Sequence, residues 1–365
     1  MSDVRKKLIV LSGGGTGGPS VVPLALAKAY RRLDPSAHFL FLGINEGFER
    51  KLFEADFQAL AVDYLALPAG KWRRYFSFLN LLDIFKIIVA FFKALFLFYR
   101  VRPDLIISAG SFASVPVVWA GRLLKIHILI HQQDVRPGLA NRLMAPWADR
   151  VSVAFAKSID DYGARAILIG NPGDSSGISV ADLLSVRKKF AINTDRPFLL
   201  VTGGGSGAVF LNKLFFATLP FLSADWQIIH QTGTGKGAGA PIRQDYQVVE
   251  SIDHQDFLAL LACADVVVAR AGLGSLGELS LLAKPSILIP IPNSQQEDNA
   301  AYFQGKGAAI VLSQANLEAK ELAAALQTLL ADKAQRARLA ENIKNIMPAD
   351  AADKGAKIIK ELLFP

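Results

Sequence analysis

A glutamate and several small residues follow a short apolar run in the second half of the chain. The run Val266–Ala269 predicts a buried strand, and Glu278 falls about one turn into the helix expected after it. A carboxylate at that place can accept hydrogen bonds from the two neighbouring hydroxyls of a ribose. Ser275 and the amides of Gly272 and Gly274 are placed to meet phosphate oxygens. The pattern predicts a nucleotide-sugar pocket; the alternative is that the glycines only turn the chain and Glu278 caps a helix.

A second apolar run supports the same location. Ser286–Ile291 predicts a neighbouring strand, and a polar loop after it enters another helix. In an open α/β sheet, ligands bind at the carboxyl ends of the strands, because helix N-termini and free backbone amides converge there. Both loops are therefore expected at one ligand-binding edge.

Two glycine loops begin in similar surroundings. Strand Leu8–Ser12 leads into Gly13–Gly18, and strand Phe198–Thr202 leads into a loop that starts at Gly203. Backbone that passes close to phosphate has no room for Cβ atoms, so glycine is favoured in such loops. The first loop fits G-x-G-x-x-G, but no acidic residue ends the next strand, as a dinucleotide site requires, and no Gly-Lys-Ser/Thr follows, as a Walker loop requires.

This internal repeat indicates two domains of the same type. Strands alternate with helices after each glycine loop, which predicts two Rossmann-like doubly wound α/β domains that face each other across a cleft. The boundary is expected in the turn-rich segment 170–177, which gives domains of residues 1–169 and 170–365. The segments Asn316–Leu330 and Lys333–Phe364 have helical spacing, and the last helix can pack back on the first domain.

Composition narrows the class of protein. The 365 residues are 52% apolar and carry a net charge of +8, which favours an anionic partner. No apolar run reaches the roughly 18 residues of a membrane span. The single cysteine, Cys263, excludes an internal disulfide and is expected in a helix core, and the N-terminus has no cleavage region of a signal peptide. We expect a reducing cytoplasm. Nucleic acid, anionic lipid and a phosphorylated substrate all qualify as the anionic partner.

The segment Lys71–Arg100 has an unusual composition. A basic aromatic cluster precedes a helix whose apolar surface is too wide for a one-sided surface helix and too often interrupted by charge for a span. This favours docking on an anionic membrane, and a buried helix that covers the sheet is the alternative; the two are compatible. The residues expected at the membrane are Lys71, Trp72, Arg73, Arg74 and Phe76.

Six motifs together resemble those of the MurG family, in the same order over nearly the whole chain. They are GGGTGG, GKWRRYFSFLNLLDIFK, SAGSFASVPVVWA, HQQDVRPGLANR, GGGSGAVFLN, and RAG followed after five residues by Glu278 and then by QQEDNA. The resemblance implies the two-domain GT-B architecture. It also implies an inverting transfer of N-acetylglucosamine from UDP to the undecaprenyl-diphospho-muramoylpentapeptide, at the cytoplasmic face of the bacterial plasma membrane, by a peripheral protein. With these substrates, no nucleic-acid partner is expected.

The resemblance also assigns substrate-binding residues. Thr16, Gly17 and Gly18 lie on the sugar and diphosphate side, Ile252 beside uracil, Glu278 on the ribose, and Gln295 and Gln296 on the sugar hydroxyls. The full set expected to bind substrate is Thr16, Gly17, Gly18, Asp134, Gly205, Ser206, Ile252, Gly272, Ser275, Glu278, Gln295, Gln296 and Asn299. No cofactor and no protein-bound metal are expected, because the chain has no Asp-x-Asp motif at a strand end; backbone amides and helix dipoles would stabilise the leaving UDP.

The chain departs from the family pattern at several positions. Pro19 replaces a usual histidine, Gly205 a usual serine, and Gly173 with Asp174 stands where an arginine usually follows GNP. Because proline has no ionisable group, the predicted catalytic residues are Asp134, as the base, and His131, for which a structural role is the alternative. Three other functions compete: a UDP-sugar-binding relative without activity, an epimerase of similar shape, and a nicotinamide oxidoreductase.

Overall fold

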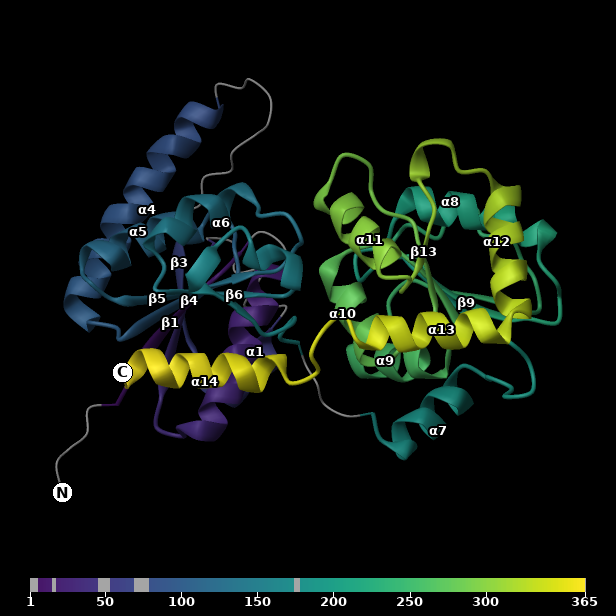
Figure 1. Cartoon of the computed structure of the whole chain (residues 1–365), viewed down its shortest axis with the longest axis horizontal. Helices are drawn as coiled ribbons and strands as arrows, with labels where there is room; N and C mark the ends of the chain where they lie inside the picture. Colours follow the sequence, from purple (N-terminus) through teal and green to yellow (C-terminus); the bar gives the residue numbers. More distant parts are fainter. Residues whose placement is uncertain (1–5, 15–17, 45–52, 69–78, 174–177, 365) are drawn as a thin grey trace. The chain divides into compact units, whose positions relative to one another are not determined.

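The structure, a computed structural model, contains two compact units (Figure 1). It describes residues 6–14, 18–44, 53–68, 79–173 and 178–364, without the side chains of residues 79–82. The first unit comprises residues 1–174 together with 348–365, and the second comprises residues 175–347. The chain therefore returns to the first unit for its last helix.

The first unit is built on a seven-stranded parallel sheet of order β3-β2-β1-β4-β5-β6-β7. Its strands are β1 (Leu8–Ser12), β2 (His38–Ile44), β3 (Asp63–Leu67), β4 (Leu105–Ser108), β5 (His127–Gln132), β6 (Arg150–Val153) and β7 (Ala166–Leu168). Its α-helices are α1 (Gly18–Leu33), α3 (Glu54–Leu60), α4 (Leu79–Val101), α5 (Ser114–Leu123), α6 (Leu139–Met144) and α14 (Ala351–Leu363). Three short 3₁₀ turns complete it: η1 (Ala145–Trp147), η2 (Ala156–Ile159) and η3 (Gly163–Arg165).

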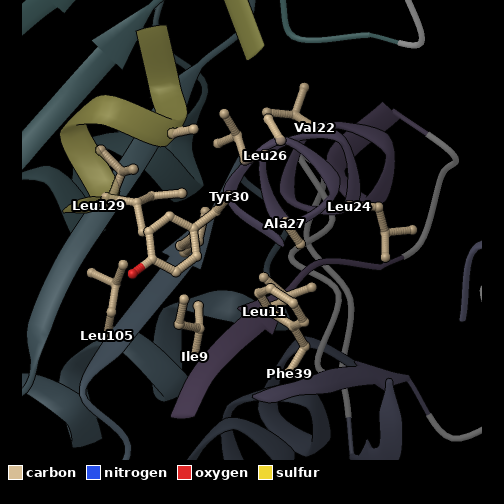
Figure 2. Packing of buried hydrophobic residues seen from close by; sticks show 14 of the residues in the cluster. Ile9, Leu11, Val22, Leu24, Leu26, Ala27, Tyr30, Phe39, Leu105 and Leu129 are labelled. Atoms are coloured by element: carbon tan, nitrogen blue, oxygen red, sulfur yellow. The ribbon is translucent and has the colours of Figure 1, made fainter. Parts of the chain in front are cut away.

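Alternate residues of the strands pack on opposite faces of this sheet. Ile9 and Leu11 of β1 lie in a core with α1 and α14, whereas Val10 lies in a second core with α4, α5 and α6. Figure 2 shows the first core, in which Tyr30 of α1 lies among strand residues such as Leu105. Burial on both faces explains why these strands are continuous apolar runs rather than alternating ones.

Helix α14 is an integral part of the first core. Its Gly355 lies so close to α1 that an added Cβ would be 2.1 Å from Cδ2 of Leu26, which permits close helix packing. Ile358 and Ile359 are buried in the same core, and α14 lies beside α1 in Figure 1. The first unit therefore depends on a segment that follows the whole second unit in the chain.

The second unit repeats the plan with a six-stranded parallel sheet of order β10-β9-β8-β11-β12-β13. Its strands are β8 (Phe198–Thr202), β9 (Gln227–Gln231), β10 (Tyr246–Val249), β11 (Val266–Ala269), β12 (Ser286–Leu288) and β13 (Ile310–Val311). Its helical elements are α7 (Val180–Lys189), α8 (Val209–Thr218), η4 (Leu219–Phe221), α9 (His254–Cys263), α10 (Leu273–Leu281), α11 (Gln295–Gly305), η5 (Gln314–Asn316), α12 (Ala319–Ala331) and α13 (Lys333–Lys344).

The predicted pair of doubly wound α/β units is confirmed, with three local corrections. Strand β12 ends at Leu288 rather than Ile291, where Pro290 removes a backbone donor. The segment predicted as one helical stretch from Lys333 forms two helices, α13 and α14, with Pro348 between them. Cys263 is on a helix, as predicted, but it is the last residue of α9 and half-buried rather than in the core.

Helix α4 has one side that is buried against the sheet and one side that is exposed. Ala90, Ala94 and Phe98 are buried against the sheet, whereas Phe92 and Phe96 are about 60% exposed, at 61% and 59%. Among the described residues, no helix is both long and apolar enough to cross a membrane. The basic cluster at residues 71–76, including Lys71, lies outside the described residues.

The packing of α14 gives a stability prediction. Replacing Ile359 with alanine removes a completely buried side chain, and such truncations cost about 2 to 5 kcal/mol. We expect the first unit of Ile359→Ala to unfold at lower denaturant concentration, measured by circular dichroism. The matched control is Lys360→Ala, which changes an exposed side chain of the same helix. Equal unfolding of the two variants would contradict the assignment of α14 to the first core.

Candidate functional site

The glycine loop of the second unit is held tightly at its end. The Gly207 amide donates to the Gly204 carbonyl at 2.9 Å, and Gly207 has a φ of +69°. A Cβ at Gly207 would lie 1.9 Å from the Thr232 carbonyl oxygen, so only glycine fits. Gly205 and Ser206, both predicted to bind substrate, are exposed in the middle of this loop. The loop therefore offers accessible backbone at the carboxyl end of β8.

The loop after β11 leads directly into helix α10. Gly272 is the N-cap of this helix, and Ser275 lies in its first turn, so amides of that turn point toward the carboxyl edge of the sheet. Arg270 is buried, and its guanidinium donates to the Ile289 carbonyl at 2.7 Å, which ties this loop to the one after β12. The two loops predicted to lie at one edge are brought together, since β11 pairs with β12.

Helix α11 supplies the predicted amide side chains. Gln296 Oε1 accepts from the Ile291 amide at 3.2 Å, and a Cβ at Gly272 would be 3.7 Å from its Nε2, so Gln296 reaches the N-cap of α10. Gln295, the first residue of α11, is half-buried. Asn299 is completely buried and donates to the Ala271 carbonyl at 3.3 Å. This bond ties α11 to the loop before α10, and substrate binding by Asn299 stays a prediction.

Glu278 lies in a desolvated position on α10. Only 23% of its side chain is exposed, and this burial raises the pKa of its carboxyl from 4.5 to about 7. His254 Nδ1 lies 3.8 Å from Glu278 Oε1. Ile252 is half-buried and lies two residues before His254, so its loop is close to Glu278. Burial therefore favours the protonated form of the Glu278 carboxyl more than in an exposed glutamate.

Lys236 is a charged residue at this edge that was not predicted from the sequence. The Lys236 ammonium donates to the carbonyls of Ser206 and Gly207 at 2.7 and 3.2 Å, so it supports the second glycine loop from the loop after β9. Its sequence signal is a lysine between glycines directly after strand β9, in GTGKG. A cation at this place adds positive potential to a loop predicted to face a diphosphate.

The first unit has an equivalent edge after β1. A Cβ at Gly13 would be 2.7 Å from the Pro19 carbonyl oxygen, so this loop also requires glycine. Gly18 begins α1, and its carbonyl accepts from the Gln133 side chain at 3.2 Å, which joins the loop after β1 to the loop after β5. Thr16 and Gly17 lie outside the described residues.

His131 is a core residue. It has no exposed surface, its Nδ1 lies 3.0 Å from the Ser152 hydroxyl, and burial lowers the pKa of its imidazole to about 3. A neutral ring that substrate cannot reach is unsuited to accept a proton from it. The geometry favours the structural role that the sequence left as an alternative.

Asp134 follows β5 in a loop held by polar contacts. Gln132 Nε2 donates to the Asp134 carbonyl at 2.7 Å, and the Gln132 side-chain oxygen accepts from Asn141 at 2.7 Å and Tyr162 at 2.9 Å. These contacts fix the backbone of Asp134, whose side chain is half-buried. Asp134 is therefore on the carboxyl edge of the first sheet.

The part of the chain that the structure describes has no group of three His, Cys, Asp or Glu side chains that could hold a metal ion.

Comparison with known proteins agrees with this arrangement. Residues 9–153 match the glycosyltransferase family 28 N-terminal domain, and residues 198–361 match its C-terminal domain. The chain is 33% identical to an N-acetylglucosamine transferase from Legionella pneumophila (strain Lens), over 97% of this chain and 96% of that protein. The name of that protein gives N-acetylmuramyl-(pentapeptide) pyrophosphoryl-undecaprenol as its acceptor. The chain belongs to the MurG family. A relative of the same name from Clostridium botulinum (strain Kyoto / Type A2) is 32% identical over 98% of each chain.

The fold of the family is shared with a solved structure. The crystal structure of Acinetobacter baumannii MurG superposes with a TM-score of 0.75 at 23% identity, covering 97% of this chain and 99% of that chain. At this identity the likeness concerns the fold. The GT-B fold and the glycosyltransferase class expected from the sequence are thus confirmed.

The raised pKa of Glu278 predicts a pH dependence of stability. The folded protein holds the proton more tightly than the unfolded chain, so stability falls as pH rises from about 4.5 through about 7. Glu278→Gln, which stays neutral, should raise the free energy of unfolding at pH 8 by roughly 2 to 3 kcal/mol. At pH 4 the two proteins should be equal. Urea denaturation at both pH values measures this, and equal stability at pH 8 would contradict a desolvated carboxyl.

Proposed function

We propose that this protein transfers N-acetylglucosamine from UDP-N-acetylglucosamine to the undecaprenyl-diphospho-muramoylpentapeptide of peptidoglycan synthesis, with inversion at the anomeric carbon. The observation that carries the proposal is the 33% identity over 97% of the chain to a transferase named for this acceptor. The departures at Pro19, Gly205 and Gly173 favour one alternative, a UDP-sugar-binding relative with altered or lost transferase activity.

The second unit is the proposed donor site. The Glu278 carboxylate accepts the ribose hydroxyls, and the α10 N-terminus with Gly272 and Ser275 receives the diphosphate. Gln295 and Gln296 bind the sugar hydroxyls, and the backbone at Gly205 and Ser206 stabilises charge on the departing UDP, with Lys236 behind the loop. Ribose binding then favours the ionised form of Glu278, which offsets part of its desolvation.

The first unit is the proposed acceptor site, and Asp134 is the proposed base. Inverting transfer requires a group that takes the proton of the acceptor hydroxyl as the anomeric carbon is attacked. Pro19 has no ionisable group and the His131 ring is buried, which leaves Asp134 as the candidate among the residues predicted for this role. Its fixed backbone at the sheet edge suits a positioned base.

A transfer assay tests both the activity and the base. With radiolabelled UDP-N-acetylglucosamine and a lipid-linked acceptor, wild type should form labelled disaccharide lipid. Asp134→Asn keeps the side-chain shape and removes basicity, so turnover should fall about 100-fold or more while UDP-sugar affinity persists. Wild-type binding without any product would support the non-catalytic relative, and an active Asp134→Asn would transfer the role of base to water or a substrate phosphate.

We further propose attachment to the anionic cytoplasmic surface of the bacterial plasma membrane through α4. Aromatic side chains recur on its exposed surface, each followed by a cation, at seven-residue intervals: Phe85 and Lys86, Phe92 and Lys93, Tyr99 and Arg100. Rings at the lipid boundary and cations at the headgroups are the two components of interfacial binding. A lipid-linked acceptor makes such attachment useful, and the cluster Lys71–Phe76 precedes the same helix.

Vesicle sedimentation tests this attachment. The double variant Phe92→Asp/Phe96→Asp should bind anionic vesicles much more weakly, because it replaces inserting rings with charges that the headgroups repel. Val180→Asp/Leu184→Asp is the matched control, with the same spacing on exposed residues of α7 in the second unit. Equal loss in both variants, or none in the α4 variant, would contradict attachment through α4.

A further inference from the structure

Three buried polar side chains form a hydrogen-bonded chain in the second unit. The Tyr246 hydroxyl on β10 lies 2.8 Å from Nδ1 of His230 on β9, and Nε2 of that ring lies 3.1 Å from Oδ1 of Asn212 on α8. His230 and Asn212 have no exposed surface, and only 7% of Tyr246 is exposed. A buried polar network specifies one arrangement of its elements more strictly than apolar packing does.

The direction of these hydrogen bonds follows from their partners. Asn212 Nδ2 donates to the Thr232 carbonyl at 2.9 Å and to the Lys236 carbonyl at 3.0 Å. Because the amide nitrogen faces two carbonyls, the amide oxygen accepts from His230 Nε2, and Nδ1 of the ring accepts from the Tyr246 hydroxyl. Burial lowers the pKa of the His230 imidazole to about 3, so the neutral ring has a single proton, at Nε2. The hydrogen bonds therefore run in one direction, from Tyr246 to the two carbonyls.

The two carbonyls are at the ends of the turn that follows β9, residues 232–236. The Asn212 amide therefore holds this turn at both ends. The turn also contacts the second glycine loop closely, since a Cβ at Gly233 would lie 2.5 Å from the Ser206 carbonyl oxygen. The position of the turn thus constrains the position of the glycine loop.

Lys236 connects the turn to the glycine loop by charge-assisted hydrogen bonds. Its ammonium donates to the carbonyls of Ser206 and Gly207 at 2.7 and 3.2 Å. In a trans peptide the N–H points opposite to the C=O of the same unit, and the described residues contain no cis peptide bond. Binding of these carbonyls therefore directs the amides of Gly207 and Ala208 away from the ammonium. Lys236 thus orients backbone donors as well as adding positive charge.

We propose that Tyr246, His230 and Asn212 are positioning residues for the donor diphosphate. Through the turn 232–236 they set Lys236 and the backbone of the glycine loop before the nucleotide binds, so that these donors need little rearrangement as charge develops on the departing UDP. Each of the three acts through its neighbour in the hydrogen-bonded chain and not by contact with substrate. The inference rests on the proposed function, because it takes the loop 203–207 as the diphosphate subsite.

A comparison of UDP with uridine isolates this subsite. Both ligands offer base and ribose to the proposed contacts at Ile252 and Glu278, but only UDP has a diphosphate for the glycine loop. Tyr246→Phe removes one hydroxyl, the first donor of the chain, and keeps the buried ring. It should weaken UDP binding at least about fivefold, the equivalent of one net hydrogen bond, and leave uridine binding unchanged. Isothermal titration calorimetry measures the affinity for UDP, and ligand-observed NMR measures the weaker affinity for uridine.

A double-mutant cycle tests whether the chain acts through Lys236. Lys236→Met removes the ammonium of a half-buried side chain and should weaken UDP binding about tenfold or more, with uridine binding retained. If Tyr246 acts through Lys236, the double variant should bind UDP within about twofold of Lys236→Met alone. Thr218→Val is the matched control, because it removes a buried hydroxyl of α8 that donates to the Leu214 carbonyl at 2.8 Å. It should change neither affinity.

The results separate positioning from a general loss of stability. Weaker UDP binding with retained uridine binding in Tyr246→Phe and Lys236→Met, but not in Thr218→Val, would support the inference, as would a non-additive double variant. Equal loss of both ligands in Tyr246→Phe, unchanged UDP binding in it, or additive losses in the double variant would overturn the inference alone. Binding of neither ligand by wild type would overturn the proposed donor site as well, so the two failures are distinguishable.

Discussion

Parallel pairing of the strands is the constraint on which the rest of this structure depends. It sends every strand of a unit toward the same edge, so the loops after β8, β11 and β12 meet although they are far apart in the sequence. At that edge the amides of starting helices are not used by the helices themselves, and they supply a positive field without ionisable side chains. The same topology in both units gives this protein two such edges, one for each proposed substrate.

The proposed donor site combines this positive field with a buried carboxyl. Glu278 lies in a desolvated place that raises the pKa of its carboxyl, which costs stability in the folded protein. In the proposed function, hydrogen bonds from the ribose hydroxyls offset part of this cost. The loop backbone is fixed by glycines such as Gly207, whose neighbour Thr232 leaves no room for a Cβ. Lys236 adds positive charge behind this loop, in which this chain has Gly205 where the family usually has a serine. Pre-organised backbone and one carboxylate thus provide most of the proposed recognition.

Much of the fold and of the candidate donor site could be predicted from the sequence, because apolar runs and glycine loops recur in the same order in both halves. The edge around Glu278 and the strand β5, predicted as HILIHQ, follow from local pattern alone. Burial of His131 and Asn299 could not be predicted, since it depends on residues such as Ser152 and Ala271 from other strands and loops. Which residues of α4 are buried depends likewise on tertiary packing. The break between α13 and α14, in contrast, could have been predicted from Pro348.

Hydrogen exchange measured by mass spectrometry, with and without UDP-N-acetylglucosamine, tests the central claim most directly. If the carboxyl edge of the second unit is the donor site, the nucleotide sugar should slow exchange of amides in the glycine loop 203–207, in 270–278 and in 294–299. Peptides of α13, on the same unit, should be unaffected. Slowed exchange only at the first glycine loop, around Gly13, with no change at Glu278 would contradict the account.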